Sequence, residues 1–190
     1  MTDETYSTLQ NERALIADAK VDPHAFAAVY DYYFARIYNY TRYRVIDPAA
    51  ADDLTSEVFE RVLTKLHTYR SDRAPFAAWL FTIARNTVNA NLRRRKHRQF
   101  FSLEAFRNRA GVDPDPDEVA ARNETYRELL DAVRKLPARD RELIALKFTS
   151  GLTNRAISKM TGLKENHVAV ILHRAVQRIR VELEEPGENP

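Results

Sequence analysis

An acidic, proline-containing run from Gly111 to Asp117 constrains the fold of this chain more than any other feature. Its sequence is Gly-Val-Asp-Pro-Asp-Pro-Asp, and because each proline restricts the residue before it to extended conformations, the run cannot be helical throughout. On both sides of it, apolar residues recur at three- and four-residue steps, as they do in amphipathic helices. We therefore expect a linker between two helical units.

Three helices are expected before the linker, over residues 24–44, 48–68 and 75–97. Their apolar faces suffice for one compact bundle. The first helix has an aromatic-rich stripe, which we interpret as core packing; it comprises Phe26, Val29, Tyr30, Tyr33, Phe34, Ile37 and Tyr38. In the second helix, Leu63 is expected to widen the buried stripe.

Four helices are expected after the linker, over residues 118–135, 138–149, 153–160 and 164–183. The last two have the spacing of a helix-turn-helix. Thr153 is a good N-cap for the first of them, and Gly162 stands where the turn needs a positive φ.

The predicted fold class is all-α, with two small helical domains joined by a flexible acidic linker. The expected boundaries are an N-terminal helical bundle at 1–97, the linker at 98–118, a helix-turn-helix domain at 119–184 and a disordered tail at 185–190. The presence of only 4 glycines and 8 prolines in 190 residues also favours helices over a turn-rich β architecture.

Composition also excludes several classes of site and location. The chain has no cysteine, which rules out disulfides and thiolate zinc sites. No apolar run is long enough to be a secretory signal or to cross a bilayer, so we expect a soluble, cytoplasmic protein without membrane insertion.

Charge is segregated along the chain, although the formal net charge is only +3. No carboxylate occurs from Arg73 to Leu103, and this stretch ends in the cluster Arg93-Arg94-Arg95-Lys96. Such a cluster offers a counterion-releasing surface for phosphate, with a solvated helix end as the alternative. Arg85, Asn86 and Asn89 extend the same surface. Tyr69 and Phe76 are expected nearby as stacking surfaces for unpaired bases.

The second helix of the helix-turn-helix is expected to lie in a major groove. Asn166 suits adenine, Ala169 or Val170 suits a thymine methyl, and Arg174 and Arg178 suit phosphate. The other side chains expected on this surface are Lys164, His167, His173 and Gln177. An ordinary helical hairpin is the alternative.

At this point the residues resemble a known family over nearly the whole chain. The run from Ala51 to Phe59 resembles region 2.2 of extracytoplasmic-function (ECF) sigma factors. The run from Phe76 to Asn86, with the arginines that follow it, resembles regions 2.3 and 2.4. Leu136-Pro137, Arg141 to Leu146, Gly151-Leu152, Gly162 and His173-Arg174-Ala175 resemble region 4.

The resemblance implies that the chain binds core RNA polymerase, at its clamp and flap, and promoter DNA, with an anti-sigma factor as a frequent partner. It implies no cofactor, no metal and no catalysis. It assigns polymerase binding to Asp52, Asp53, Leu54, Glu57, Val58 and Phe59. It assigns the −10 element to Tyr69, Arg70, Arg73, Phe76, Arg85, Asn86, Asn89, Arg93, Arg94, Arg95 and Lys96. It assigns the −35 element to Thr153, Lys164, Asn166, His167, Ala169, Val170, His173, Arg174 and Arg178.

The chain departs from the family pattern at a few positions. Ala90 replaces an acidic residue of region 2.4, and Ala156 replaces a frequent glutamate. Ala169, Val170 and Ile171 stand at recognition positions where Lys, Arg and Ser are usual. These departures bear on the promoter sequence rather than on the class.

Two other functions are compatible with parts of the sequence. One is a helix-turn-helix regulator whose aromatic N-terminal bundle senses a ligand, which would need dimerisation to read paired half-sites. The other is an enzyme, but the five histidines have no HExxH spacing and no glycine-rich phosphate loop occurs.

Overall fold

The computed structural model describes residues 11–45, 47–101 and 120–184, and these residues contain helices but no strand. In chain order the helices are α1 (Glu12–Ala19), η1 (Pro23–Phe26), α2 (Ala27–Val45), α3 (Pro48–Lys65), η2 (Leu66–Thr68), α4 (Phe76–Phe101), α5 (Ala120–Lys135), α6 (Ala138–Ser150), α7 (Asn154–Thr161) and α8 (Glu165–Glu184). The all-α prediction is therefore confirmed. None of these helices is long and apolar enough to cross a membrane.

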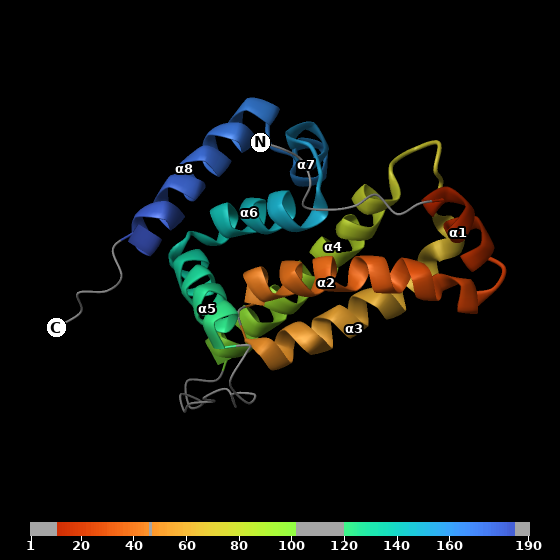
Figure 1. Cartoon of the computed structure of the whole chain (residues 1–190), viewed down its shortest axis with the longest axis horizontal. Coiled ribbons are helices and arrows are strands. Elements are labelled where there is room, and N and C mark those ends of the chain that lie inside the picture. The colour runs from red at the N-terminus through yellow and green to blue at the C-terminus, as the bar shows by residue number, and fades with distance from the viewer. Residues whose placement is uncertain (1–10, 46, 102–119, 185–190) are drawn as a thin grey trace.

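The helices form two groups that pack against each other (Figure 1). In the N-terminal group, α2, α3 and α4 make a bundle with α1 at one end. In the C-terminal group, α6 lies along α2, and α8 packs on α6, α5 and α7, while α7 reaches α4. The predicted linker at 98–118 lies outside the described residues from 102 onward, as does the predicted tail at 185–190.

The expected helices occur within a few residues of their predicted bounds. Helix α4 is longer than expected, because it continues to Phe101 rather than ending at residue 97. Helix α1 was not expected at all. The Asp22-Pro23 pair starts a 3-10 turn, in which the Asp22 carboxylate accepts from the His24 amide at 2.9 Å, and α2 begins only at Ala27.

One continuous apolar core extends through both groups of helices. The largest side chains fully inside it are Tyr40, Phe76, Phe81, Ile37, Leu54, Leu80, Leu143, Leu146 and Ile157. Three predicted core residues are wrong, because Tyr30, Phe34 and Leu63 are 37%, 39% and 45% exposed. The rings of Tyr30 and Phe34 pack on Phe59 from the outside, at centroid distances of 4.5 and 6.4 Å.

The helix-turn-helix begins and turns where its sequence predicts. The Thr153 hydroxyl caps α7 by accepting from the Ala156 amide at 3.2 Å. Gly162 ends α7 with φ at 75°, a left-handed conformation in which any side chain is strained. Across the turn, Ser158 Oγ of α7 donates to the carbonyl of Leu163, the residue after Gly162, at 2.6 Å.

Candidate nucleic-acid interface

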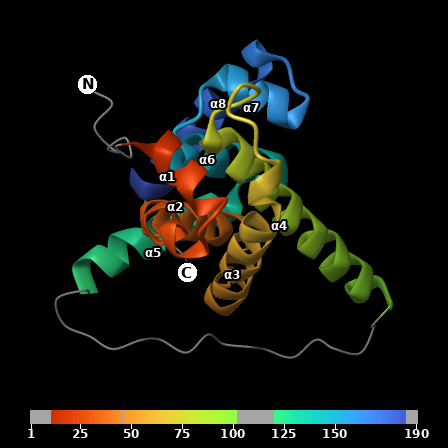
Figure 2. The same cartoon turned by 90° about the vertical axis from the view of Figure 1, so that its right-hand side faces the viewer.

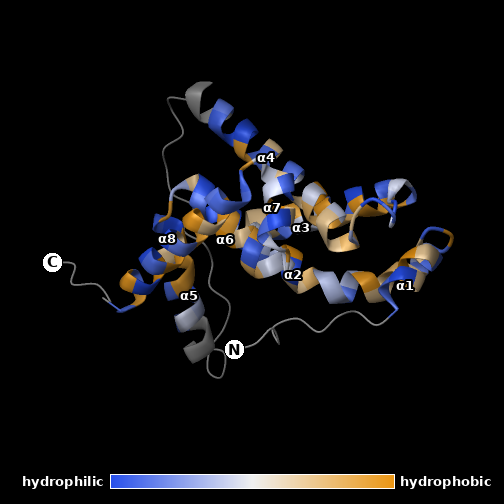
Figure 3. Cartoon of the chain, turned by 90° about the horizontal axis from the view of Figure 1, so that it is seen from above, coloured by the Kyte–Doolittle hydropathy of each residue, from blue (hydrophilic) through white to orange (hydrophobic). Residues whose placement is uncertain are grey.

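The C-terminal half of α4 carries the densest positive charge of the described structure. Arg93, Arg94 and Lys96 are exposed, and Arg95 forms a 3.5 Å ion pair with Asp47 at the start of α3. This part of the helix projects away from the bundle (Figure 2) and is hydrophilic in its last described turns (Figure 3). It can therefore meet a phosphate backbone from several sides.

Nearer the bundle, Arg85 and Asn89 lie on the α4 face that meets α6. Arg85 Nε donates to Glu142 Oε1 at 2.7 Å, and Asn89 Nδ2 lies 3.5 Å from the same oxygen. Arg44 of α2 completes the group: its guanidinium lies 3.4 Å from Glu142 Oε1 and donates to Asn89 Oδ1 at 2.7 Å. We call these four residues the Glu142 cluster.

The Glu142 cluster changes its surroundings as well as joining the two groups of helices. Burial raises the pKa of Tyr40, which lies beside the Glu142 cluster, although the positive charge of Arg44 acts in the opposite direction.

Asn86, one residue from Arg85, is exposed. Of the predicted −10 residues on this part of α4, only Asn86 is thus open to solvent here.

The loop before α4 divides into buried rings and exposed cations. Tyr69 and Phe76 are 6% and 1% exposed, and their rings meet edge to face at 5.2 Å. The Tyr69 hydroxyl donates to the Ala74 carbonyl at 3.1 Å, which closes the loop. Neither ring offers a face to a base in this structure, so the expectation of stacking there is wrong for this conformation.

Both cations of that loop, Arg70 and Arg73, are exposed. Arg70 Nε lies 3.3 Å from Asp72, and a backbone hydrogen bond followed by the bond from Arg70 lowers the pKa of that carboxyl.

Next to these loop residues, the half-buried Trp79 lines an open cleft of about 460 Å³ between α4 and α7. Trp79 is the aromatic residue of this region that keeps some exposed surface, and the sequence reasoning did not select it.

All the predicted −35 residues except Thr153, which caps α7, gather on or just before α8. Lys164, Asn166, His167, Ala169, Val170, His173, Arg174 and Arg178 are all exposed, seven of them on α8 and Lys164 just before it. Inward-facing Val168, Ile171 and Leu172 hold the helix against its neighbours. Two of the exposed side chains already have partners, because His167 lies 3.4 Å from Arg139 and Arg178 lies 3.3 Å from Asp140.

The predicted polymerase-binding residues on α3 separate into two faces. Asp52 and Asp53 are exposed and Glu57 is half-buried, whereas Leu54, Val58 and Phe59 are buried at 4% exposure or less. The buried three therefore support the bundle and present no surface to a partner here. The outward apolar surface on this side comes instead from Tyr30 and Phe34, which the sequence reasoning had placed in the core.

Two family models match the chain. "Sigma-70 region 2" matches residues 29–98, and "Sigma-70, region 4" matches residues 126–179. Together they include α2, α3, most of α4 and the helix-turn-helix.

Named relatives agree with these matches. The ECF RNA polymerase sigma factor BldN of Streptomyces coelicolor is 33% identical over 88% of this chain, which spans 62% of that relative's length. The corresponding factor SigD of Mycobacterium tuberculosis is 29% identical, over 95% of this chain and 89% of its own.

The fold agrees with a solved structure as well. The sigma factor RpoE of Bartonella quintana, in complex with the anti-sigma factor NepR, matches 85% of this chain and 98% of its own, with a TM-score of 0.69 at 19% identity. The paired region 2 and region 4 matches, together with these relatives, show that the chain belongs to the ECF family of RNA polymerase sigma factors.

Proposed function

We propose that this chain binds core RNA polymerase and directs it to promoters, where it recognises the −10 and −35 elements and promotes melting of the DNA. The observation that carries the proposal is the presence of two separate polar and cationic surfaces, on α4 and on α8, each on a rigid helix of one chain. The two domains at 1–97 and 119–184 would then contact one promoter at two places.

The α4 surface suits the melted −10 strand. Its cations can neutralise phosphates without reading sequence, while Asn86 and Trp79 are available for bases. The α8 surface suits the major groove of the −35 element, because the second helix of a helix-turn-helix fits that groove and would present Asn166 to base edges. Ala169 and Val170 favour thymine methyl groups over polar readout.

Polymerase binding is proposed for the acidic face of α3 together with the exposed rings of α2. Asp52 and Asp53 lie on the same side of the bundle as Tyr38, whose pKa is raised by burial and by the charge of Asp52. An acidic and aromatic surface is complementary to a basic, apolar one, as we propose for the polymerase clamp. The flap of polymerase is proposed as the partner of the C-terminal domain.

A cytoplasmic location and control by an anti-sigma factor complete the proposal. The Bartonella quintana RpoE structure contains such an inhibitor, NepR, and supports this class of partner for the present chain. The function itself requires recognition rather than catalysis.

Transcription in vitro tests the proposal. The purified chain is added to core polymerase with a library of promoter fragments taken from genomic DNA, and start sites are mapped. Discrete start sites that depend on the chain are expected. Transcription no better than that of core polymerase on every fragment, or a stable dimer that binds palindromic duplex without polymerase, would refute it.

A further inference from the structure

We infer that the contact between the two groups of helices blocks part of the proposed DNA-binding surface. Glu142 of α6 binds the side chains of α4 that a DNA phosphate would bind, and Glu142 must move away before that part of α4 can bind DNA. The inference rests on the proposed function of Arg85 and Asn89. It adds a competitor for them from within the chain.

The geometry of Glu142 is that of a bound anion. Three side chains from two helices converge on Oε1: Arg85 and Asn89 donate hydrogen bonds at 2.7 and 3.5 Å, and the guanidinium of Arg44 forms an ion pair at 3.4 Å. The Glu142 side chain is only 16% exposed, and the side chains of Arg44 and Arg85 are 6% and 23% exposed. This carboxylate is therefore held at the interface rather than in solvent.

A second tie fixes Arg85 to the C-terminal group. Its terminal guanidinium nitrogen donates to the Met160 carbonyl at 3.1 Å, near the end of α7. Met160 is 75 positions along the chain from Arg85. Both contacts of this arginine with the C-terminal group break if α6 and α7 move away from α4.

A carboxylate and a phosphate oxygen are interchangeable ligands for an arginine. The guanidinium presents its donors in a planar fork that matches either group, and an amide such as that of Asn89 donates equally well to both. Phosphate cannot enter while Glu142 Oε1 lies 2.7 Å from Arg85 Nε, because the two acceptors would occupy one position. Binding of DNA there and docking of α6 are therefore mutually exclusive, and each weakens the other to the same extent.

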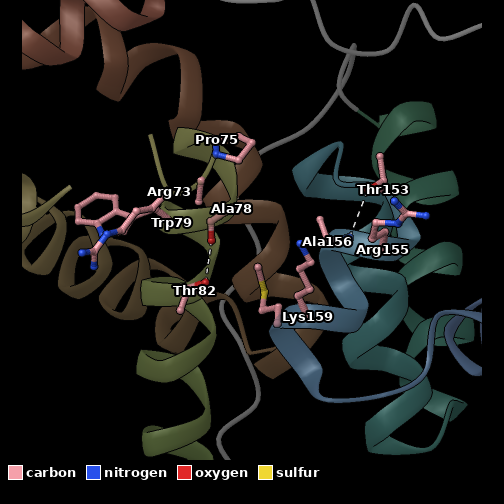
Figure 4. A pocket seen from close by; sticks show the side chains of 11 residues that line it. Arg73, Pro75, Ala78, Trp79, Thr82, Thr153, Arg155, Ala156 and Lys159 are labelled. Carbon is pink, nitrogen blue, oxygen red and sulfur yellow. Dashed lines mark hydrogen bonds between the residues drawn. The ribbon is translucent and has the colours of Figure 1, made fainter. Parts of the chain in front are cut away.

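The rest of the interface is suited to reversible separation. On one side of the Glu142 cluster, Tyr126 of α5 donates to Asn39 of α2 at 3.2 Å. On the other side is the open cleft between α4 and α7, across which Ala78 and Thr82 face Ala156 and Lys159 (Figure 4). An interface that is incompletely packed along one edge loses dispersion contacts and opens more readily.

The exposed neighbours of the cluster give DNA a place to start. Asn86, Arg93 and Arg94 are exposed on the same helix while the Glu142 cluster is intact. A strand can bind these residues first and then displace Glu142, since breaking a partly buried ion pair is far less costly when a new anion replaces the old one.

Binding of a fluorescein-labelled oligothymidylate to the full chain tests the inference without a promoter or polymerase. Glu142→Gln should bind about tenfold more tightly than the parent, because it leaves Arg44 and Arg85 without their anion and favours separation. Glu182→Gln is the matched control: it makes the same replacement and removes the same charge, but Glu182 pairs with Lys135 within the C-terminal group. It should bind within about twofold of the parent.

A second variant acts on the interface without touching the cluster. Tyr126→Phe removes the hydroxyl that donates to Asn39 and should strengthen oligothymidylate binding about threefold. It keeps the inference testable even if Glu142→Gln fails to fold, which thermal melting followed by circular dichroism will show.

The separation itself can be measured, because the chain has no cysteine of its own. Spin labels at Ser56→Cys on α3 and Gln177→Cys on α8, both exposed, report the distance between the two groups of helices. The parent should give one short distance, and a longer one should appear in Glu142→Gln or when oligothymidylate is added to the parent.

Three results would overturn the inference. They are equal effects of Glu142→Gln and Glu182→Gln on binding, an unchanged label distance in Glu142→Gln, or a longer distance without tighter binding. These results are separate from the transcription test. If no promoter responds but Glu142→Gln still opens the interface and tightens binding, the proposed function fails and the competition stands.

Discussion

The Tyr33 hydroxyl donates a 2.6 Å hydrogen bond to Glu12 Oε1, and this bond fastens α1 to α2. Tyr33 is 2% exposed, and its ring also meets Phe76 edge to face at 5.6 Å. The bond thus links the first described helix to Phe76, the ring that packs against Tyr69 of the loop before α4. Loss of α1 would expose the end of the bundle next to the proposed −10 surface.

Tyr33→Phe should lower the free energy of unfolding by about 1–2 kcal/mol, because the Glu12 carboxylate loses its donor while the ring stays in place. Urea unfolding followed by circular dichroism measures it. Tyr30→Phe is the control, since its half-exposed ring keeps its packing on Phe59 and its hydroxyl is not tied to α1. Equal losses in the two variants would contradict a specific role for the Glu12 bond.

Stability should fall as the pH rises above 10. Burial, followed by the hydrogen bond to Glu12, raises the pKa of Tyr33 above the ordinary tyrosine value of 10.0, and burial also raises the pKa of Tyr40. Above pH 10 the unfolded chain releases these protons while the folded chain retains them, so their contribution to stability is present below pH 10 and is lost above it. The decline between pH 9 and pH 11 should be shallower in Tyr33→Phe than in the parent.

Asp52→Asn with Asp53→Asn should weaken binding to core polymerase about tenfold, if the α3 face meets a basic surface of polymerase. Both residues are exposed, so folding should not change. Phe59→Ala is unsuitable for this purpose because the ring is buried and its loss costs about 3–5 kcal/mol of stability. Asp131→Asn on α5 is the control, and fluorescence titration with labelled polymerase is the measurement.

Arg93→Ala with Arg94→Ala should weaken promoter opening and leave polymerase binding intact. Each lost phosphate contact lowers the dependence of log affinity on log salt by about one for duplex and somewhat less for a single strand. A salt titration of oligothymidylate binding measures this slope. Arg134→Ala with Lys135→Ala removes two cations from the end of α5 and should leave the slope unchanged. A weakened polymerase complex instead would reverse our assignment of the two surfaces.

On α8, Asn166→Ala and Arg174→Ala should have different consequences. The first should relax the preference at one base position, at a cost of about 1–3 kcal/mol for the preferred base. The second should weaken binding to all sequences alike, because phosphate carries no sequence information. Selection from randomised −35 duplexes, with the holoenzyme as bait, distinguishes the two patterns. Uniform weakening in both variants would argue against base reading by Asn166.

Local rules account for what could be predicted about the fold. Thr153 and Gly162 determine where α7 begins and ends, because a cap and a left-handed turn act within one helical turn of sequence. Helix α1 was missed because it is short and buries only Ile16 and Ala19, too few residues to make a recognisable apolar stripe. Its place depends on the distant ring of Tyr33, which no local pattern reveals.

The candidate site was less predictable than the fold for the same reason. Exposure of the α8 residues follows from helical periodicity. The burial of Tyr69 and Phe76 does not, since an aromatic residue beside a basic helix fits either a core or a stacking surface. The pairing of Arg85 with Glu142 joins residues 57 positions apart, and it arises only when the two groups of helices meet.

Helix α4 is continuous to Phe101, past the end that its sequence suggests, and this continuity fixes the distances between its side chains along the helix axis. Arg85 and Arg93 are eight residues apart, so a rigid helix fixes their axial spacing at about 12 Å. That length equals about three to four stacked nucleotides at about 3.4 Å each. Under the proposed function, the rise of the helix would set the spacing between the phosphates that the two arginines contact. Adding or deleting one residue between them would rotate one arginine by about 100° relative to the other.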